Sequence, residues 1–159
     1  MNDSIKEKVM DEIARRLSLI KESSGYWTTV RIVQRTHDMA PERPTAPTVY
    51  VYEGQEVKDD QEVPNLINCS LPVGIVYACE NQREKAQWAN RMLQDIEVAV
   101  GLEYILTCPS GATVTAYFNM KSTDVHVDDQ GGPVIVATCV LETQYRHAPG
   151  NPADVVCIC

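Results

Sequence analysis

The stretch VIVATCVLETQYRHAPGNP, residues 134–152, starts as an almost unbroken apolar run and ends in Tyr-Arg-His before a turn. Its odd-numbered positions from 135 to 145 stay largely apolar, whereas its even-numbered positions change from mostly apolar residues to Glu142, Gln144 and Arg146. Side chains of a strand alternate between two faces, so the change affects one face only. We therefore expect a strand whose first half is covered on both faces and whose second half extends beyond its cover.

The polar end of this predicted strand has two interpretations. It can leave the core and enter solvent, or it can contact a neighbouring subunit through Glu142, Gln144, Arg146 and His147. In the second case Glu142 and Arg146 offer opposite charges four residues apart along one side of the strand.

A second long strand is predicted for NCSLPVGIVYACE, residues 68–80. Counting by two places Cys, Leu, Val, Ile and Tyr on one face, and mostly small or polar residues on the other. Pro72 lacks a backbone donor and Gly74 lacks a side chain, so the strand either lies at an edge there or is closely approached. Shorter runs predict further strands over residues 26–35, 48–53, 113–118 and 124–127, with loops over residues 36–47 and 54–65.

Two stretches have the periodicity of amphipathic helices, residues 4–22 and 81–100. Ser4 and Glu7 have capping-box spacing, and Gly25 supplies a stop after the first helix. In the second helix Trp88 and Met92 widen the apolar stripe beyond what packing on one sheet face requires. These two residues either broaden the core face or meet another subunit, since Trp and Met are enriched at interfaces.

The order of these elements predicts an α+β fold in one domain over residues 1–159, with residues 150–159 as a C-terminal tail. We expect a mostly antiparallel sheet with both amphipathic helices packed on one face. The net charge of -8 argues against a general nucleic-acid binder, which carries a basic face. The chain has neither an apolar run long enough for a bilayer nor a signal-peptide pattern, so we expect a soluble protein made in the cytosol.

The sequence lacks the common catalytic and metal-binding motifs. It contains no nucleophile elbow, phosphate loop, dinucleotide fingerprint or HExxH pattern. The six cysteines lack metal-type spacing and are expected to be buried free thiols. One cluster of carboxylate and imidazole groups lies near a turn and is formed by Asp124, His126, Asp128 and Asp129. These residue types can bind a metal, but a turn rich in Asp and Gly also forms without one. We expect no catalytic, cofactor or metal site, and a small metal- or thiol-dependent enzyme is the alternative from another class.

Several stretches together resemble the tail terminator (tail-completion) proteins of long-tailed bacteriophages. The resemblance covers nearly the whole chain through the helix ending in Gly25-Tyr26, the strands VRIVQR, PTVYVYEG and LPVGIVYACE, the helix EKAQWANRMLQDIEVAV and the final strand ending ETQYRHAPGNP. These are diffuse patterns rather than a catalytic fingerprint.

The resemblance implies a structural virion protein of the tail or neck, with no enzymatic activity. Such subunits close into a ring, typically a hexamer, at the head-proximal end of the tail tube, where they stop tube growth and provide the docking surface for the head connector. The implied partners are further copies of the chain, the tail tube protein, connector or neck proteins and, in a contractile tail, the sheath protein. Genome DNA would pass through the ring without specific binding, which an acidic lumen would favour. No membrane is involved. The alternative within the same machine is another neck, head-tail joining or sheath-associated component.

Overall fold

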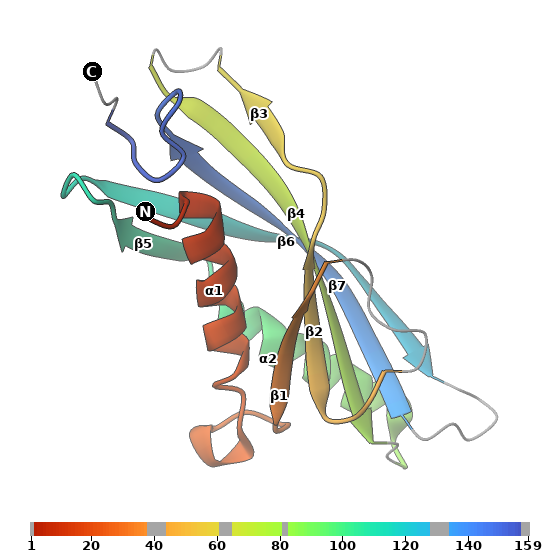
Figure 1. Ribbon diagram of the computed structural model, residues 1–159. Coiled ribbons are helices and arrows are strands. Elements are labelled where there is room, and N and C mark those ends of the chain that lie inside the picture. Colours follow the sequence, from red (N-terminus) through yellow and green to blue (C-terminus); the bar gives the residue numbers. More distant parts are fainter. Residues whose placement is uncertain (1, 38–43, 61–64, 81–82, 128–133, 157–159) are drawn as a thin grey trace.

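The computed structural model describes residues 2–37, 44–60, 65–80, 83–127 and 134–156. Within these residues two helices and a curled sheet form one layered unit (Figure 1). In chain order the elements are α1 (Ile5–Leu17), the 3-10 turn η1 (Glu22–Ser24), β1 (Ile32–Thr36), β2 (Thr48–Glu53), β3 (Val57–Asp59), β4 (Ile67–Glu80), α2 (Lys85–Val100), β5 (Glu103–Thr107), β6 (Thr113–Val127) and β7 (Val134–His147).

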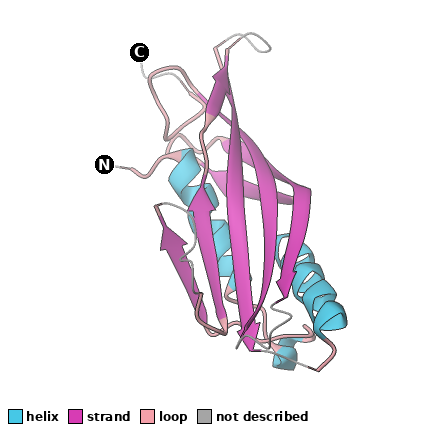
Figure 2. Ribbon diagram, turned by 90° about the vertical axis from the view of Figure 1, so that its right-hand side faces the viewer, coloured by secondary structure: helices cyan, strands magenta, loops and turns pink. Residues whose placement is uncertain are grey.

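The strands form one sheet in the order β1-β2-β4-β7-β6-β5, with β3 also paired to β4. Every pairing is antiparallel except β1 with β2. The ladder between β4 and β7 is the longest, running from the Ile67–His147 pair to the Glu80–Val134 pair. Figure 2 shows the long strands side by side in a single curved layer. The predicted α+β class with a mostly antiparallel sheet is confirmed.

Both helices pack on the same face of this sheet. The buried side of α1 presents Ile5, Val9, Ile13 and Leu17, and α2 adds its own buried residues to the same cluster. The sheet contributes alternate residues of its central strands: Val49, Val51, Leu71, Val73, Ile75, Tyr77, Ile135, Ala137, Cys139 and Leu141. One hydrophobic core therefore lies between the helices and the sheet, and the other sheet face carries no helix of the described chain.

The first helix begins where the sequence predicts and ends earlier. The Ser4 side chain accepts a hydrogen bond from the Glu7 N–H at 3.1 Å, which confirms the cap. The helix ends at Leu17 instead of residue 22, and the Val30 N–H then binds the Ile20 carbonyl at 2.9 Å. Gly25, with φ of 91°, ends η1 rather than α1. The chain therefore leaves the helical path five residues before the predicted stop.

The predicted strand over residues 26–35 is wrong in its first half. The strand β1 starts only at Ile32, because the preceding backbone is held by α2. The Asp95 carboxylate accepts hydrogen bonds from the N–H groups of Trp27 and Thr28 at 3.0 and 2.8 Å. These donors bind a helix side chain instead of a neighbouring strand.

The second helix begins at Lys85 instead of residue 81, and residues 81–82 lie outside the described chain. Ala86, predicted on the apolar stripe, is exposed, whereas Ala89, Met92, Asp95 and Ile96 are buried. Gly101 ends the helix as predicted, and its N–H donates to the Glu97 carbonyl at 3.1 Å.

Three strand predictions needed correction. The predicted loop over residues 54–65 contains β3, which pairs with the start of β4. The strand β5 was not predicted, and the two short strands expected at 113–118 and 124–127 are parts of the single strand β6. A register shift between Met120 and Ser122 interrupts its pairing with β7. Such a bulge changes which positions face each side, and this hides the continuity of the strand from simple alternation.

Gly74 shows which interpretation of β4 is correct. The strand lies inside the sheet, so the edge alternative is wrong. A Cβ atom on Gly74 would lie 2.1 Å from the Tyr52 ring, so close approach explains the missing side chain. Pro72 lies where β2 has ended and β3 has not begun, and its carbonyl accepts from the Gly54 N–H at 2.7 Å. Its missing donor therefore removes no bond from the ladder with β7.

The end of the described chain packs beside its beginning (Figure 1). The Ile5 N–H donates to the Pro152 carbonyl at 2.8 Å, which joins the start of α1 to the turn after β7. Asp154 is buried and accepts from the Ser110 N–H and hydroxyl at 2.8 and 2.7 Å. The described part of the predicted tail is thus anchored to the domain.

Candidate functional site

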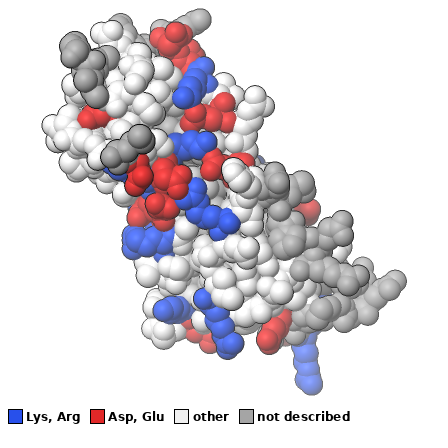
Figure 3. All heavy atoms as spheres, in the orientation of Figure 1, with Lys and Arg blue, Asp and Glu red and all other residues white. Residues whose placement is uncertain are grey.

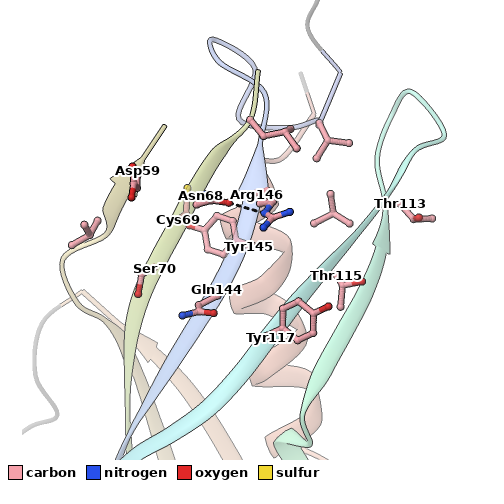
Figure 4. A pocket seen from close by; sticks show the side chains of 14 residues that line it. Asp59, Asn68, Cys69, Ser70, Thr113, Thr115, Tyr117, Gln144, Tyr145 and Arg146 are labelled. Carbon is pink, nitrogen blue, oxygen red and sulfur yellow. Dashed lines mark hydrogen bonds between the residues drawn. The ribbon is translucent and has the colours of Figure 1, made fainter. Parts of the chain in front are cut away.

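A cavity lies where two neighbouring strands of the sheet part. The pairing of β6 with β7 begins at Tyr117–Gln144. Beyond that pair β7 follows β4 to His147, while β6 pairs only with β5. The opening has a volume of about 730 Å³, and we call it the interstrand groove (Figure 4). Its lining is Val57, Asp59, Leu66, Asn68, Cys69, Ser70, Thr113, Val114, Thr115, Tyr117, Gln144, Tyr145, Arg146 and Val155.

The polar row predicted at the end of β7 lies on the helix-free face beside this groove. Gln144 and Arg146 line the groove and are exposed, and Glu142, two residues earlier on the same face of β7, is half-buried. The Arg146 Nε donates to the Asn68 Oδ1 at 2.6 Å across the β4–β7 ladder (Figure 4). The guanidinium is therefore held over the groove by a neighbouring strand.

Glu142 and Arg146 do not pair with each other. Glu142 forms an ion pair with Lys121 at 3.2 Å and accepts from the Ser70 hydroxyl at 3.1 Å and the Gln144 amide at 3.3 Å. Lys121, with smaller contributions from Ser70 and Gln144, lowers the pKa of Glu142 below its ordinary value. The row is thus an ordered set of polar groups drawn from β4, β6 and β7.

The floor of the groove is fixed by a buried contact with the segment before β3. The Tyr145 hydroxyl donates to a carboxylate oxygen of Glu56, and Glu56 also pairs with Lys58 at 3.3 Å. Burial, followed by the hydrogen bond to the Glu56 carboxylate, raises the pKa of Tyr145, so the phenol stays protonated. This contact holds one wall of the groove against β7.

Three of the six predicted interface residues are not on this surface. His147 is buried on the helix-facing side, with Nδ1 2.8 Å from the Ala148 carbonyl oxygen. Met92 is fully buried in the core, and Trp88 is half-buried against it. The predicted role of Met92 and His147 as surface contacts is wrong, because the core encloses both side chains. The wide stripe of α2 broadens the core instead.

The first half of β7 also differs from expectation. Its even-numbered residues are half-buried rather than covered: Val134, Val136, Thr138 and Val140. The helix-free face therefore changes along β7 from half-exposed apolar groups to exposed polar groups.

Several groove residues were not found by sequence reasoning. Tyr117 and Thr115 come from β6, and Asn68 and Ser70 come from β4. Alternation placed Ser70 on the polar face of its strand, but nothing in the sequence showed which strand lies beside which. The register that brings Gln144 opposite both Ser70 and Tyr117 exists only in the assembled sheet.

The cysteines of the described chain are poor nucleophiles. Cys69, Cys79, Cys108 and Cys139 are free and buried, as predicted, while Cys157 and Cys159 lie outside the described residues. Burial raises the pKa of Cys69 to about 11 and that of Cys139 to about 12. The reactive thiolate is therefore scarce at neutral pH at these two positions.

The acidic cluster near the β6–β7 connection is only partly described. Asp124 and His126 are exposed on β6, and Asp128 and Asp129 lie outside the described residues. The Asp124 carboxylate accepts from the N–H of Val125 at 2.8 Å. Within the described chain, no group of three or more His, Cys, Asp or Glu side chains is arranged to hold a metal ion.

Charges of both signs are mixed on the face that carries α1. Figure 3 shows acidic and basic side chains next to one another in a band across the molecule. Arg35 pairs with Glu7 at 2.5 Å and with Asp11 at 2.8 Å, and Lys6 pairs with Glu53 at 2.6 Å. A face with this pattern does not offer the uniform positive charge that phosphate backbones require.

Comparisons with protein-family models and with curated proteins find no match for this chain. None of the helices in the described ranges is both long and apolar enough to cross a membrane.

Proposed function

We propose that the protein is a structural ring subunit that caps the head-proximal end of a bacteriophage tail tube. In this role it ends tube polymerisation and offers the docking surface for the head connector. The proposal rests on the resemblance of the sequence to tail terminator proteins and on one structural observation. An ordered polar row, exposed at Gln144 and Arg146, borders a groove on the sheet face that no described helix covers.

The character of the groove favours contact with a protein over catalysis. Its polar lining combines Arg146, Gln144, Asn68 and Tyr117, which are groups that hydrogen-bond and stack on another surface. Its single cysteine, Cys69, has a pKa raised to about 11 by burial, which opposes thiol chemistry. We infer that a segment of a neighbouring protein, either another copy or the tube or connector, lies along this row.

Arg146→Glu tests the proposal. The substitution replaces the one positive charge of the row with a negative charge and removes the donor that binds Asn68, so we expect reduced ring assembly or reduced capping of tail tubes. A loss of about tenfold in the equilibrium constant for capping corresponds to about 1.4 kcal/mol of contact energy. Negative-stain imaging with and without tail tubes, together with native mass spectrometry, measures both quantities.

Arg83→Glu is the matched control, because Arg83 is exposed and lies outside the groove lining. Both variants should remain folded by circular dichroism. Equal capping by both variants and the wild type would remove the polar row from the proposal. A wild-type protein that forms no ring alone and none on tubes would contradict the terminator role itself. Binding to a connector or sheath without capping of tubes would favour another neck component.

A further inference from the structure

The start of β6 directs backbone groups into the interstrand groove. The Phe118 N–H donates to the Leu102 carbonyl at 2.8 Å, so Phe118 and the other even-numbered residues of this part of β6 are bonded on the β5 side. Alternate residues of a strand bond to opposite neighbours. The N–H and C=O groups of Thr113 and Thr115 are therefore directed toward β7, where β6 has no strand partner before Tyr117.

The end of β7 directs backbone groups into the groove from the other side. Tyr117 is paired with Gln144, and because Tyr117 is directed toward β7, Gln144 is directed toward β6. Arg146 lies two residues further along β7 and so has the same direction, but the pairing with β6 has ended there. The opening thus has the N–H and C=O of Arg146 on one side and those of Thr113 and Thr115 on the other.

Beyond Arg146 the same opening already holds a segment of polypeptide. Ala148 donates its N–H to the Asp154 carbonyl at 2.7 Å, and the Asp154 carboxylate accepts from the Ser110 N–H at 2.8 Å. Asp154 therefore joins the end of β7 to the turn before β6, and Val155, the next residue, lines the groove. The space between the two strands is thus bridged by backbone at one end and open at the other.

Arg146 is the charged group at the opening itself. Its Nε donates to Asn68 at 2.6 Å, and within the described residues it has no other hydrogen bond and no ion pair. Figure 4 shows its side chain in the opening between β7 and β6. Asp59 also lines the groove, but β4 separates its strand from β7. The two Nη groups of Arg146 therefore keep their donors, in the geometry that a carboxylate accepts.

We propose that the interstrand groove binds an extended segment of a partner protein that carries a carboxylate side chain. The segment uses the backbone groups of Thr113, Thr115 and Arg146 as hydrogen-bond partners and places its carboxylate on the Arg146 guanidinium. In strand addition of this kind main-chain bonds supply affinity and side-chain contacts supply specificity. Tyr117 is 55 % exposed beside the groove and offers its ring to a side chain of the segment. The inference rests on the proposed function in taking a neighbouring protein as the ligand.

A pentapeptide with the sequence Thr-Val-Glu-Val-Thr, blocked at both ends, is the probe. Titration of the isotope-labelled full chain, followed by nuclear magnetic resonance up to about 10 mM peptide, reaches dissociation constants in the millimolar range. The amide signals of Thr113, Thr115 and Arg146 should shift and saturate. The matched peptide with Gln in place of Glu should bind about tenfold more weakly. Equal affinity for the two peptides, or no saturable shift at these amides, would overturn the proposal.

Arg146→Gln tests the assigned partner of the carboxylate. The variant should bind the Glu peptide about tenfold more weakly than the wild type and should no longer prefer it to the Gln peptide. Arg83→Gln is the control, because Arg83 is exposed and outside the groove lining, and it should keep the preference. The amide spectrum of each variant reports whether it is folded. A folded Arg146→Gln variant that still prefers the Glu peptide would show that Arg146 does not bind the carboxylate.

Anions without a peptide backbone test the role of the main chain. Sodium acetate, inorganic phosphate and a Glu pentapeptide methylated at every backbone nitrogen all keep a negative charge, but none can pair as a strand. Each should bind at least about tenfold more weakly than the unmodified Glu peptide. Binding of any of them as tight as that of the unmodified peptide would identify a simple anion site and overturn strand addition.

The outcomes separate this inference from the proposed function. A wild type that caps tail tubes while its groove amides ignore the Glu peptide overturns peptide binding and leaves the capping role in place. A wild type that binds the Glu peptide in the groove but neither forms rings nor caps tubes supports the groove inference and contradicts the terminator role.

Discussion

Asp95 is an ionisable residue buried on a helix that packs against the sheet. Its carboxylate accepts from the N–H groups of Trp27 and Thr28 and from the Thr28 hydroxyl at 2.7 Å, and the Tyr77 hydroxyl donates to Thr28 at 2.9 Å. Three donors thus replace the water that a carboxylate loses on burial. Through this one side chain α2 holds the backbone of Trp27 and Thr28, just before the start of β1.

Asp95→Ala should lower the free energy of unfolding by about 3 kcal/mol, because buried N–H donors would lose their acceptor. Urea unfolding followed by circular dichroism measures this change. Glu97→Ala on the exposed side of the same helix is the control and should change stability by about 0.5 kcal/mol or less. Equal effects of the two substitutions would show that the Asp95 network does not stabilise the fold.

The charged pairs on the surface behave differently from Asp95. Arg35 pairs with Asp11, and Lys121 pairs with Glu142. The side chains of Asp11 and Lys121 are both more than half exposed. Exposed ion pairs contribute little to stability, since water screens them and both side chains lose freedom. Their value here lies in orienting groups, as Lys121 and Ser70 orient Glu142 beside the groove.

At the scale of elements, β4 carries the packing that links the two halves of the sheet. It pairs with β2, β3 and β7, and Gly74 allows the Tyr52 ring of β2 to lie across it. The Tyr52 ring covers β4 at Gly74, where it leaves no room for a side chain. A glycine inside a strand normally weakens it, and here the aromatic contact offsets that loss.

Gly74→Ala should therefore destabilise the protein by about 2–3 kcal/mol, the usual cost of overpacking, because the new Cβ would overlap the Tyr52 ring. Thermal and urea unfolding measure the effect. In a Tyr52→Ala background the same substitution should cost about 1 kcal/mol or less, since the overlap is gone. Gly54→Ala is a milder control, with its nearest atom at 3.2 Å. A Gly74→Ala variant as stable as the wild type would contradict the close approach of the ring.

At the scale of the whole molecule, Arg16 joins the helical layer to the sheet edge. Its guanidinium donates to the carbonyls of Val100 and Glu103, and its Nε donates to Glu12 at 2.8 Å. The same group lies 5.5 Å from the centre of the Phe118 ring. One side chain thus connects α1, the end of α2, β5 and β6, and Glu12 holds it in position.

Acid should weaken the contact between Glu12 and the arginines that it holds in position. Hydrogen bonding by Arg15, with a further contribution from Arg16, lowers the pKa of Glu12 from 4.5 to about 2 in the folded protein. A folded-state pKa below the unfolded value stabilises the protein above pH 4.5 and loses that contribution as pH falls toward 2. Glu12→Gln should lower stability by about 1 kcal/mol at pH 7 and show a smaller further loss in acid.

Urea unfolding at several pH values between 7 and 2 tests this expectation. Glu97→Gln serves as the control, because Glu97 is exposed on α2 and should leave the acid dependence unchanged. A Glu12→Gln variant whose stability falls with pH in parallel with the wild type would contradict the role assigned to Glu12.

The sequence predicted the elements that have strong local signals. Alternation identified β2, β4 and β7 with nearly correct bounds, and helical periodicity with Ser4 and Gly101 identified α1 and α2. It failed where distant contacts override local preference. Trp27 and Thr28 are bound to Asp95, β3 and β5 are short edge strands, and the bulge after Met120 hides the continuity of β6.

The candidate site also has one part that the sequence predicted and one part that it did not. The residue types on one face of β7 change along the strand, so the polar row of Glu142, Gln144 and Arg146 could be predicted from the sequence alone. The groove beside the row could not, because it arises where β6 turns away from β7 beyond the Tyr117–Gln144 pair. Met92 and His147 were misplaced for a related reason: periodicity shows that a face is apolar or polar, but only packing determines what covers it. Local pattern determined the strands and helices of this protein, whereas their neighbours, and hence its groove and its free edges, were decided by the tertiary structure.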